Sequence, residues 1–130
     1  MATIVNFEDM EIWQLARQLN KDIYPLLNLL KEGKNFELKG QLDGSAGSVM
    51  DNISEGFERD GNREFIQFLA ISKGSLGEVR SQLFRAFDRE FLNESELQKL
   101  QTDAKTLANK IGKFMTYLRN SEIKGKKFKK

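Results

Sequence analysis

The last third of the chain carries one apolar stripe, and this stripe restricts the possible folds more than any other feature. Its members recur at steps of three and four residues, which places them on one face of an α-helix. Asn93 precedes the stripe, and Glu96 follows three residues later, as in a capping box at a helix start. The sequence predicts a helix over 94–120 whose apolar face comprises Leu97, Leu100, Ala104, Leu107, Ile111, Phe114 and Leu118.

Three further segments show the same spacing and predict helices over 7–31, 37–55 and 63–91, the first with Asn6 as its N-cap. Short connections make consecutive helices antiparallel neighbours. We therefore expect an all-α protein, an antiparallel up-down-up-down four-helix bundle over residues 1–122. Its other apolar faces comprise Ile12, Ala16, Leu19, Ile23, Leu27 and Leu30, then Leu38, Leu42, Ala46, Val49 and Ile53, then Phe65, Leu69, Ser72, Leu76, Val79, Leu83 and Ala86.

Glycines interrupt two of these helices, although each costs about 1 kcal/mol in a helix interior relative to Ala. The explanation that we favour is that the missing side chains let a neighbouring helix approach closely, and the alternative is that the second helix is weak and partly frayed. Gly56 has a different predicted place, the C′ position directly after the second helix, where the chain turns. The glycines expected at close helix contacts are Gly40, Gly44, Gly47, Gly74 and Gly77.

Composition excludes several classes of site. The chain of 130 residues has no Cys and no His, so it lacks thiolate ligands and the commonest general base. Motifs for phosphate binding or nucleophilic catalysis do not occur. Asp51 and Glu55 lie one helical turn apart, but such pairs are common on solvated helices. We predict no enzyme, no cofactor and no metal site. Because no secretory signal or membrane span is visible, we expect a cytoplasmic protein that does not bind membranes.

Charge is distributed unevenly. Five of the 21 Lys and Arg residues lie within 123–130, which we expect to be a flexible basic tail, and the remaining 16 are outnumbered by 19 Asp and Glu residues. Such a tail either neutralises phosphates without sequence preference or serves only as a solubilising end. The candidate nucleic-acid-binding residues are Lys124, Lys126, Lys127, Lys129 and Lys130 of the tail, with Arg17, Lys21, Arg59 and Arg63 of the body.

Two other features concern contacts. The chain has 10 Phe, more than a lone four-helix core readily covers, and exposed apolar patches often mark subunit contacts. We therefore expect self-association. Asn52 lies beside the apolar face of the second helix, where it either fixes helix register or contacts a partner, and we favour the structural role.

Four stretches in order carry a resemblance to a known family: "FEDMEIWQLARQL" near the start, "NISEGFER" at 52–59, "REFIQFLAISKGSLGEV" at 63–79, and the Leu-rich last helix. Together they resemble the bacterial four-helix-bundle family first named for proteins encoded in intervening sequences of 23S ribosomal RNA genes. The resemblance covers about residues 6–120. The residues that we single out in its motifs, in structural roles, are Asn52, Glu55, Gly56 and Trp13.

The resemblance implies a ring-like homopentamer without known catalysis, acting as an accessory protein associated with nucleic acid or a ribonucleoprotein. Relatives include the accessory variability protein of diversity-generating retroelements, whose pentamer binds a reverse transcriptase and nucleic acid. The family often has two Arg residues and an Ile-Pro pair early in the second helix. Here the matching residues are Asp43, Gly44, Val49 and Met50. The alternative is therefore a structural protein–protein interaction module with no nucleic-acid binding.

Overall fold

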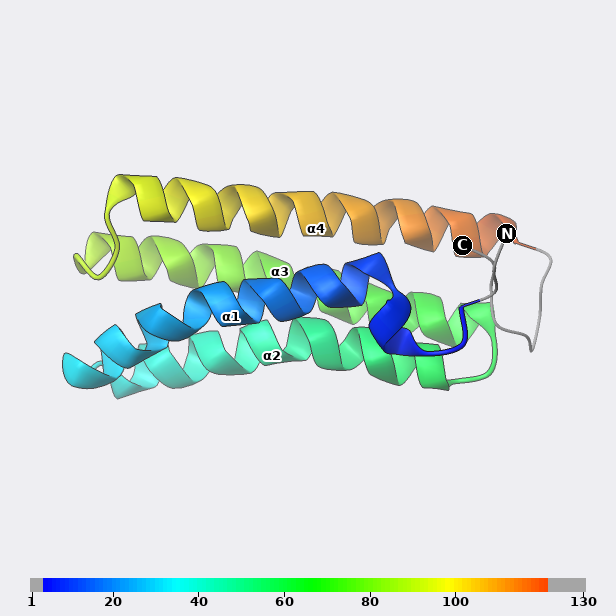
Figure 1. Ribbon diagram of the computed structural model, residues 1–130, viewed down its shortest axis with the longest axis horizontal. Coiled ribbons are helices and arrows are strands. Elements are labelled where there is room, and N and C mark those ends of the chain that lie inside the picture. Colours follow the sequence, from blue (N-terminus) through cyan, green and yellow to red (C-terminus); the bar gives the residue numbers. More distant parts are fainter. Residues whose placement is uncertain (1–3, 122–130) are drawn as a thin grey trace.

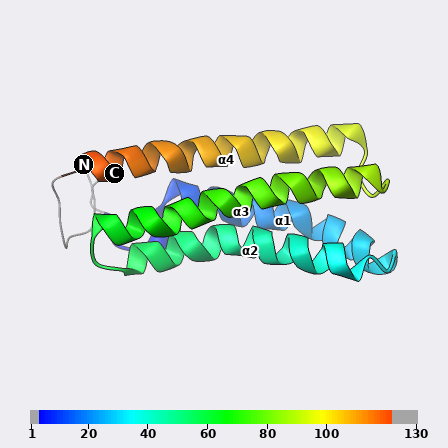
Figure 2. The same ribbon diagram turned by 180° about the vertical axis from the view of Figure 1, so that it is seen from behind.

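The computed structural model describes residues 4–121, and these contain four long helices and no strand. The helices are α1 (Glu11–Glu32), α2 (Phe36–Glu58), α3 (Asn62–Asp88) and α4 (Glu94–Asn120), and a short 3-10 helix, η1 (Phe7–Asp9), precedes them. Figure 1 shows the four long helices side by side in one elongated bundle, and Figure 2 shows the same arrangement from behind. The predicted all-α four-helix bundle is confirmed.

Each helix packs on two neighbours. α1 contacts α2 and α4, and α3 contacts the same two helices, whereas the backbones of α1 and α3 do not approach each other closely within residues 4–121. The closest-packed pair is α2 with α3, and the most loosely packed neighbouring pair is α1 with α4. The order around the bundle is therefore α1, α2, α3, α4.

The core is built from the faces that the sequence predicts. All the stripe residues predicted for the first three helices are buried, including the polar Ser72, whose hydroxyl donates to the Val49 carbonyl at 2.7 Å. In α4 the stripe is also buried except at Phe114, which is half-buried, while the neighbouring Met115 is buried. Phe114 instead contacts the Phe65 ring edge-to-face at 5.7 Å, which the large aromatic side chain reaches from the margin of the core.

Two helices end in Schellman motifs built on residues other than glycine. Lys34 has φ 60°, and the Asn35 N–H donates back to the Leu30 carbonyl at 2.8 Å. Glu90 has φ 68°, and the Phe91 N–H donates to the Ala86 carbonyl at 3.0 Å. These bonds satisfy carbonyls that a helix end leaves free. The second motif ends α3 at Asp88, three residues before the predicted end at 91.

The start of the first helix differs from the prediction. Asn6 makes no side-chain cap; η1 follows it, and α1 begins only at Glu11. The reason is packing, because Ile4 and Met10 are buried and the Phe7 ring meets Trp13 edge-to-face at 5.1 Å. Continuing a regular helix back to residue 7 would not allow the chain to fold over the end of the bundle in this way.

The glycine prediction is wrong. A methyl group added at Gly40, Gly44, Gly47, Gly74 or Gly77 would meet nothing within 4 Å. These glycines lie on the outer faces of α2 and α3, so no neighbouring helix of the same chain explains them.

Within the described residues, no helix is both long enough and apolar enough to cross a bilayer.

Candidate functional site

Asn52 belongs to a polar cluster between α2 and α3. It is half-buried, and its amide donates to the Ser48 carbonyl at 2.8 Å and to the Ser48 hydroxyl at 2.9 Å. Ser75 of α3 also donates to the Ser48 hydroxyl, at 2.8 Å. Asn52 is thus tied to α3 through the Ser48 hydroxyl, which accepts from both Asn52 and Ser75. The cluster offers no unpaired nucleophile or base.

Gly56 lies inside α2, not after it, and is buried. A Cβ atom there would come within 2.7 Å of the Phe68 Cβ and 2.8 Å of the Phe65 Cδ1. The expected C′ role is therefore wrong: α2 continues to Glu58, and Gly56 leaves room for the Phe65 and Phe68 side chains of α3. Phe57, the next residue, is buried in the core.

Glu55 holds Arg59. The Arg59 Nε donates to the Glu55 carboxylate at 3.0 Å, Glu64 lies 3.7 Å from the same guanidinium, and the group also stacks over the Phe68 ring at 5.1 Å. Exposed ion pairs of this kind contribute about 0–1 kcal/mol. Arg59 lies at the α2–α3 connection, where Glu55 and Glu64 largely neutralise its charge. It is therefore a weak candidate for phosphate contact.

The other predicted cations do not form one surface. Arg17 and Lys21 are exposed on α1, with the Arg17 guanidinium 5.8 Å from the Trp13 ring centre, and Trp13 itself is half-buried. Arg63 is exposed at the start of α3, which lies diagonally across the bundle from α1. The predicted tail residues Lys124, Lys126, Lys127, Lys129 and Lys130 lie outside the described residues.

The end of the bundle beside Arg63 includes the last turn of α4. The Asn62 side chain donates to the Leu118 carbonyl at 3.1 Å, which ties the start of α3 to the end of α4. Arg119 is exposed in this last turn. The helix ends at Asn120, and Ser121 is the last residue that the structure describes. We call Arg63 and Arg119 the arginine end; Arg119 was not among the sequence candidates.

A shallow groove of about 420 Å³ runs between α2 and α3. Gln82 lines it and is only 8% exposed, yet its Oε1 atom is buried without a hydrogen-bond partner. An unpaired buried polar group costs about 1–3 kcal/mol. Arg85 lies at the groove but is engaged, donating to the Gln41 amide oxygen at 2.7 Å. The groove is lined by Gly40, Gln41, Gly44, Ser45, Ser48, Glu78, Gln82 and Arg85.

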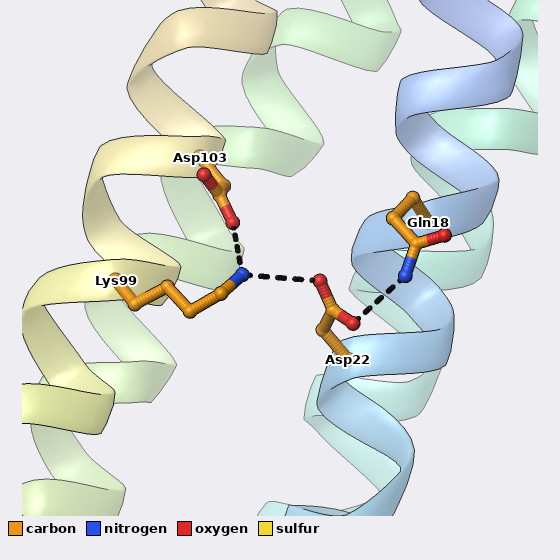
Figure 3. Close-up of polar contacts among 4 residues, drawn as sticks. All are labelled: Gln18, Asp22, Lys99 and Asp103. Carbon is orange, nitrogen blue, oxygen red and sulfur yellow. Dashed lines mark hydrogen bonds and ion pairs between the residues drawn. The ribbon is translucent and has the colours of Figure 1, made fainter.

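A second groove, of about 430 Å³, lies between α1 and α4 and is crossed by an ion-pair chain (Figure 3). Lys99 donates to Asp103 at 2.8 Å and to Asp22 of α1 at 3.4 Å, and Gln18 donates to the other Asp22 oxygen at 2.9 Å. The hydrogen bond to Asp103, together with the negative charges of Asp103 and Asp22, raises the pKa of the Lys99 ammonium above its usual range. The three charged side chains of this network, Asp22, Lys99 and Asp103, are paired with one another. The network therefore bridges two helices and offers no reactive group.

Sequence reasoning missed Gln82 and Lys99. Both are ordinary surface-type residues, and only their neighbours on other helices distinguish them. A partial signal existed for Gln82, because Ser72, Ser75 and Gln82 recur at steps of three and seven along one edge of an apolar helix. Asp51 and Glu55 are not joined by a further acidic ligand, and residues 4–121 contain no group of three or more Asp or Glu side chains able to hold a metal ion.

Comparison with known proteins adds the family. The model of the 23S rRNA-intervening sequence proteins matches residues 8–113. The chain belongs to this family. None of the curated proteins matches it. Among solved structures, a protein of unknown function from the S23 ribosomal protein family of Bacteroides thetaiotaomicron is 19% identical, with a TM-score of 0.75 over 80% of this chain and 97% of that one. At this identity the likeness concerns the fold, and it agrees with family membership.

Proposed function

We propose that this member of the 23S rRNA-intervening sequence family is a non-catalytic, homo-oligomeric accessory protein, a pentameric ring, that associates with nucleic acid or a ribonucleoprotein. Family membership over residues 8–113 is the observation that carries the proposal. The described residues support the non-catalytic part, because the Asn52 cluster and the Lys99 ion pairs are held by hydrogen bonds among their own members. A reverse transcriptase partner stays a prediction.

The arginine end is the surface we assign to nucleic acid. Arg63 and Arg119 are exposed there without a protein partner among the described residues, and the five tail lysines follow Ser121 in the sequence. Glu58 and Asp60 are exposed at the α2–α3 connection and offset these two arginines. The tail must therefore supply the net positive charge, and nucleic-acid binding depends on it.

The test measures binding of the full chain to fluorescent RNA and DNA across a salt series. If all five tail lysines contact phosphates, the logarithm of affinity should fall with the logarithm of salt at a slope of about −3.5 to −4.5. A variant with these five lysines replaced by Gln keeps the length and should lose most of the binding. The proposal is wrong if low salt reveals no binding, or if binding is unchanged in the Gln variant and at high salt.

One observation favours a second candidate, a protein-interaction module without nucleic-acid affinity. The outer face of α2 is acidic, with Glu37, Asp43, Asp51 and Glu58 exposed along it, and it would repel phosphates. This candidate predicts a stable oligomer that binds neither RNA nor DNA in the same salt series.

A further inference from the structure

The α2–α3 groove is open where a side chain would ordinarily lie. Gly40 and Gly44 border it, each occupies a helix interior, and a Cβ at either position would meet nothing within 4 Å. Within one chain these glycines only weaken α2. Their absent side chains are useful if the backbone of another chain lies against them.

Gln82 indicates a missing partner independently of the glycines. It lines the same groove, is more than nine-tenths buried, and its Oε1 atom accepts no hydrogen bond. Buried acceptors in folded proteins are nearly always paired. An occupant of the groove that carries an N–H donor would supply the missing bond.

Charge defines the occupant further. Glu78 lines the groove, and Glu37 and Asp51 are exposed on the same outer face of α2 as Gly40 and Gly44. Their three carboxylates have no ionic partner among residues 4–121, whereas the nearby Arg85 is hydrogen-bonded to Gln41. The groove therefore fits a cationic helix face rich in N–H donors.

The chain itself presents such a face on α1. Six exposed residues follow one another at alternating steps of three and four, the spacing of a helix seam that packs on another helix. They include three cations and no carboxylate, and Tyr24 among them is 61% exposed. We call this set the α1 seam: Gln14, Arg17, Lys21, Tyr24, Asn28 and Lys31.

We propose that the α1 seam of one copy of this chain docks in the α2–α3 groove of a second copy. The contact joins two different surfaces, so it is heterologous and can repeat from chain to chain. α1 packs beside α2, and not opposite the groove, so the two surfaces lie on adjacent sides of the bundle (Figures 1 and 2). Repeated heterologous contacts form a ring when the rotation between copies closes and a helical filament when it does not, so the ring of the proposed function requires a closing rotation.

This inference rests on the homo-oligomer of the proposed function and assigns its interface. It also separates the cations: Arg17 and Lys21 belong to the subunit contact, whereas the arginine end stays open to nucleic acid.

The test uses the full chain and two variants, with mass measured by light scattering. Gly44→Lys fills the groove and repels the seam, and Arg17→Glu/Lys21→Glu reverses the seam. Each variant alone should have the mass of one chain, 15.0 kDa. An equimolar mixture should form a two-chain complex, because the intact seam of the first variant still fits the intact groove of the second.

Matched controls carry the same changes elsewhere. Gly77→Lys places a lysine on the outer face of α3 outside the groove, and Lys105→Glu/Lys113→Glu reverses two exposed charges on α4. Both should keep the mass of the unaltered chain. The inference is overturned, with the oligomer itself intact, if the groove and seam variants also keep that mass. It is overturned together with the proposed ring if the unaltered chain has the mass of one chain.

Gln82→Met gives an independent readout. The isolated fold should tolerate it, because it removes a buried acceptor that has no partner in the chain. Association should nevertheless weaken several-fold, because the donor of the docked copy loses its acceptor. Unchanged association in Gln82→Met would contradict a role for Gln82 in the groove.

Discussion

At the scale of single residues, identical amino acids have opposite roles according to what surrounds them. Gly56 is buried, with atoms of Phe65 and Phe68 less than 3 Å from the position of a Cβ. Gly44 is exposed on the same helix, with nothing within 4 Å of that position. The first glycine is required by packing inside the chain, and the second is not.

We expect Gly56→Ala to destabilise the fold by about 1–3 kcal/mol, because the added methyl group forces α2 and α3 apart. Gly44→Ala should instead stabilise the fold of the single chain by about 0.5–1 kcal/mol, because it lowers the backbone entropy lost on folding without a clash inside the chain. Urea unfolding followed by circular dichroism measures both. Equal effects of the two substitutions would contradict the close approach at Gly56.

At the scale of the elements, the helices differ in how their ends are held. α4 begins with a complete capping box, in which the Asn93 side chain accepts from the Glu96 N–H at 2.8 Å and the Asn93 N–H donates to Glu96 at 2.9 Å. The N-caps of α1, α2 and α3 make no side-chain cap. These three helices depend on packing to hold their first turns.

Asn93→Ala should therefore lower the free energy of unfolding by about 1 kcal/mol, the usual effect of removing an N-cap side chain. Asn6→Ala is the control, because Asn6 stands before η1 without a cap bond, and it should change stability by less than about 0.5 kcal/mol. Thermal unfolding of both variants provides the comparison, and a larger loss for Asn6→Ala would refute this account of the helix starts.

At the scale of the whole molecule, the helix pairs of the bundle are not packed equally tightly. α2 and α3 are joined by close packing and hydroxyl hydrogen bonds, whereas α1 and α4 are loosely packed and linked by Lys99 and by the Lys110–Glu11 ion pair at 3.2 Å. The side of the bundle between α1 and α4 therefore relies on exposed charges more than any other side.

Stability should show this dependence at high pH. The pKa of Lys99 is raised in the folded chain above the unfolded value of about 10.4, so its ion pairs contribute fully below that pH and are lost as pH rises through the folded pKa. Lys99→Met should cost less than about 1 kcal/mol near neutral pH, since the side chain is exposed, and the difference should disappear at a pH above the folded pKa.

Urea unfolding at both pH values measures the effect. Lys105→Met is the control, since Lys105 is exposed on the same helix without an ion-pair partner among the described residues. A pH-independent difference for Lys99→Met would show that its aliphatic chain, and not its charge, stabilises the α1–α4 side.

The sequence by itself determined the four helices and most of the core residues, through apolar periodicity, and the capping box of α4, through Asn93 and Glu96. These depend on spacing and local hydrogen bonding, which are properties of neighbouring residues. Only the tertiary structure decided that Gly56 lies at a close helix contact and that Gly40, Gly44, Gly47, Gly74 and Gly77 face outward. It also decided that Gln82 has a buried, unpaired oxygen and that Lys99 links α4 to α1. Each of these results depends on which helix lies beside which. Periodicity identifies the face that a helix buries, but it does not specify the residue of another helix that the face will meet.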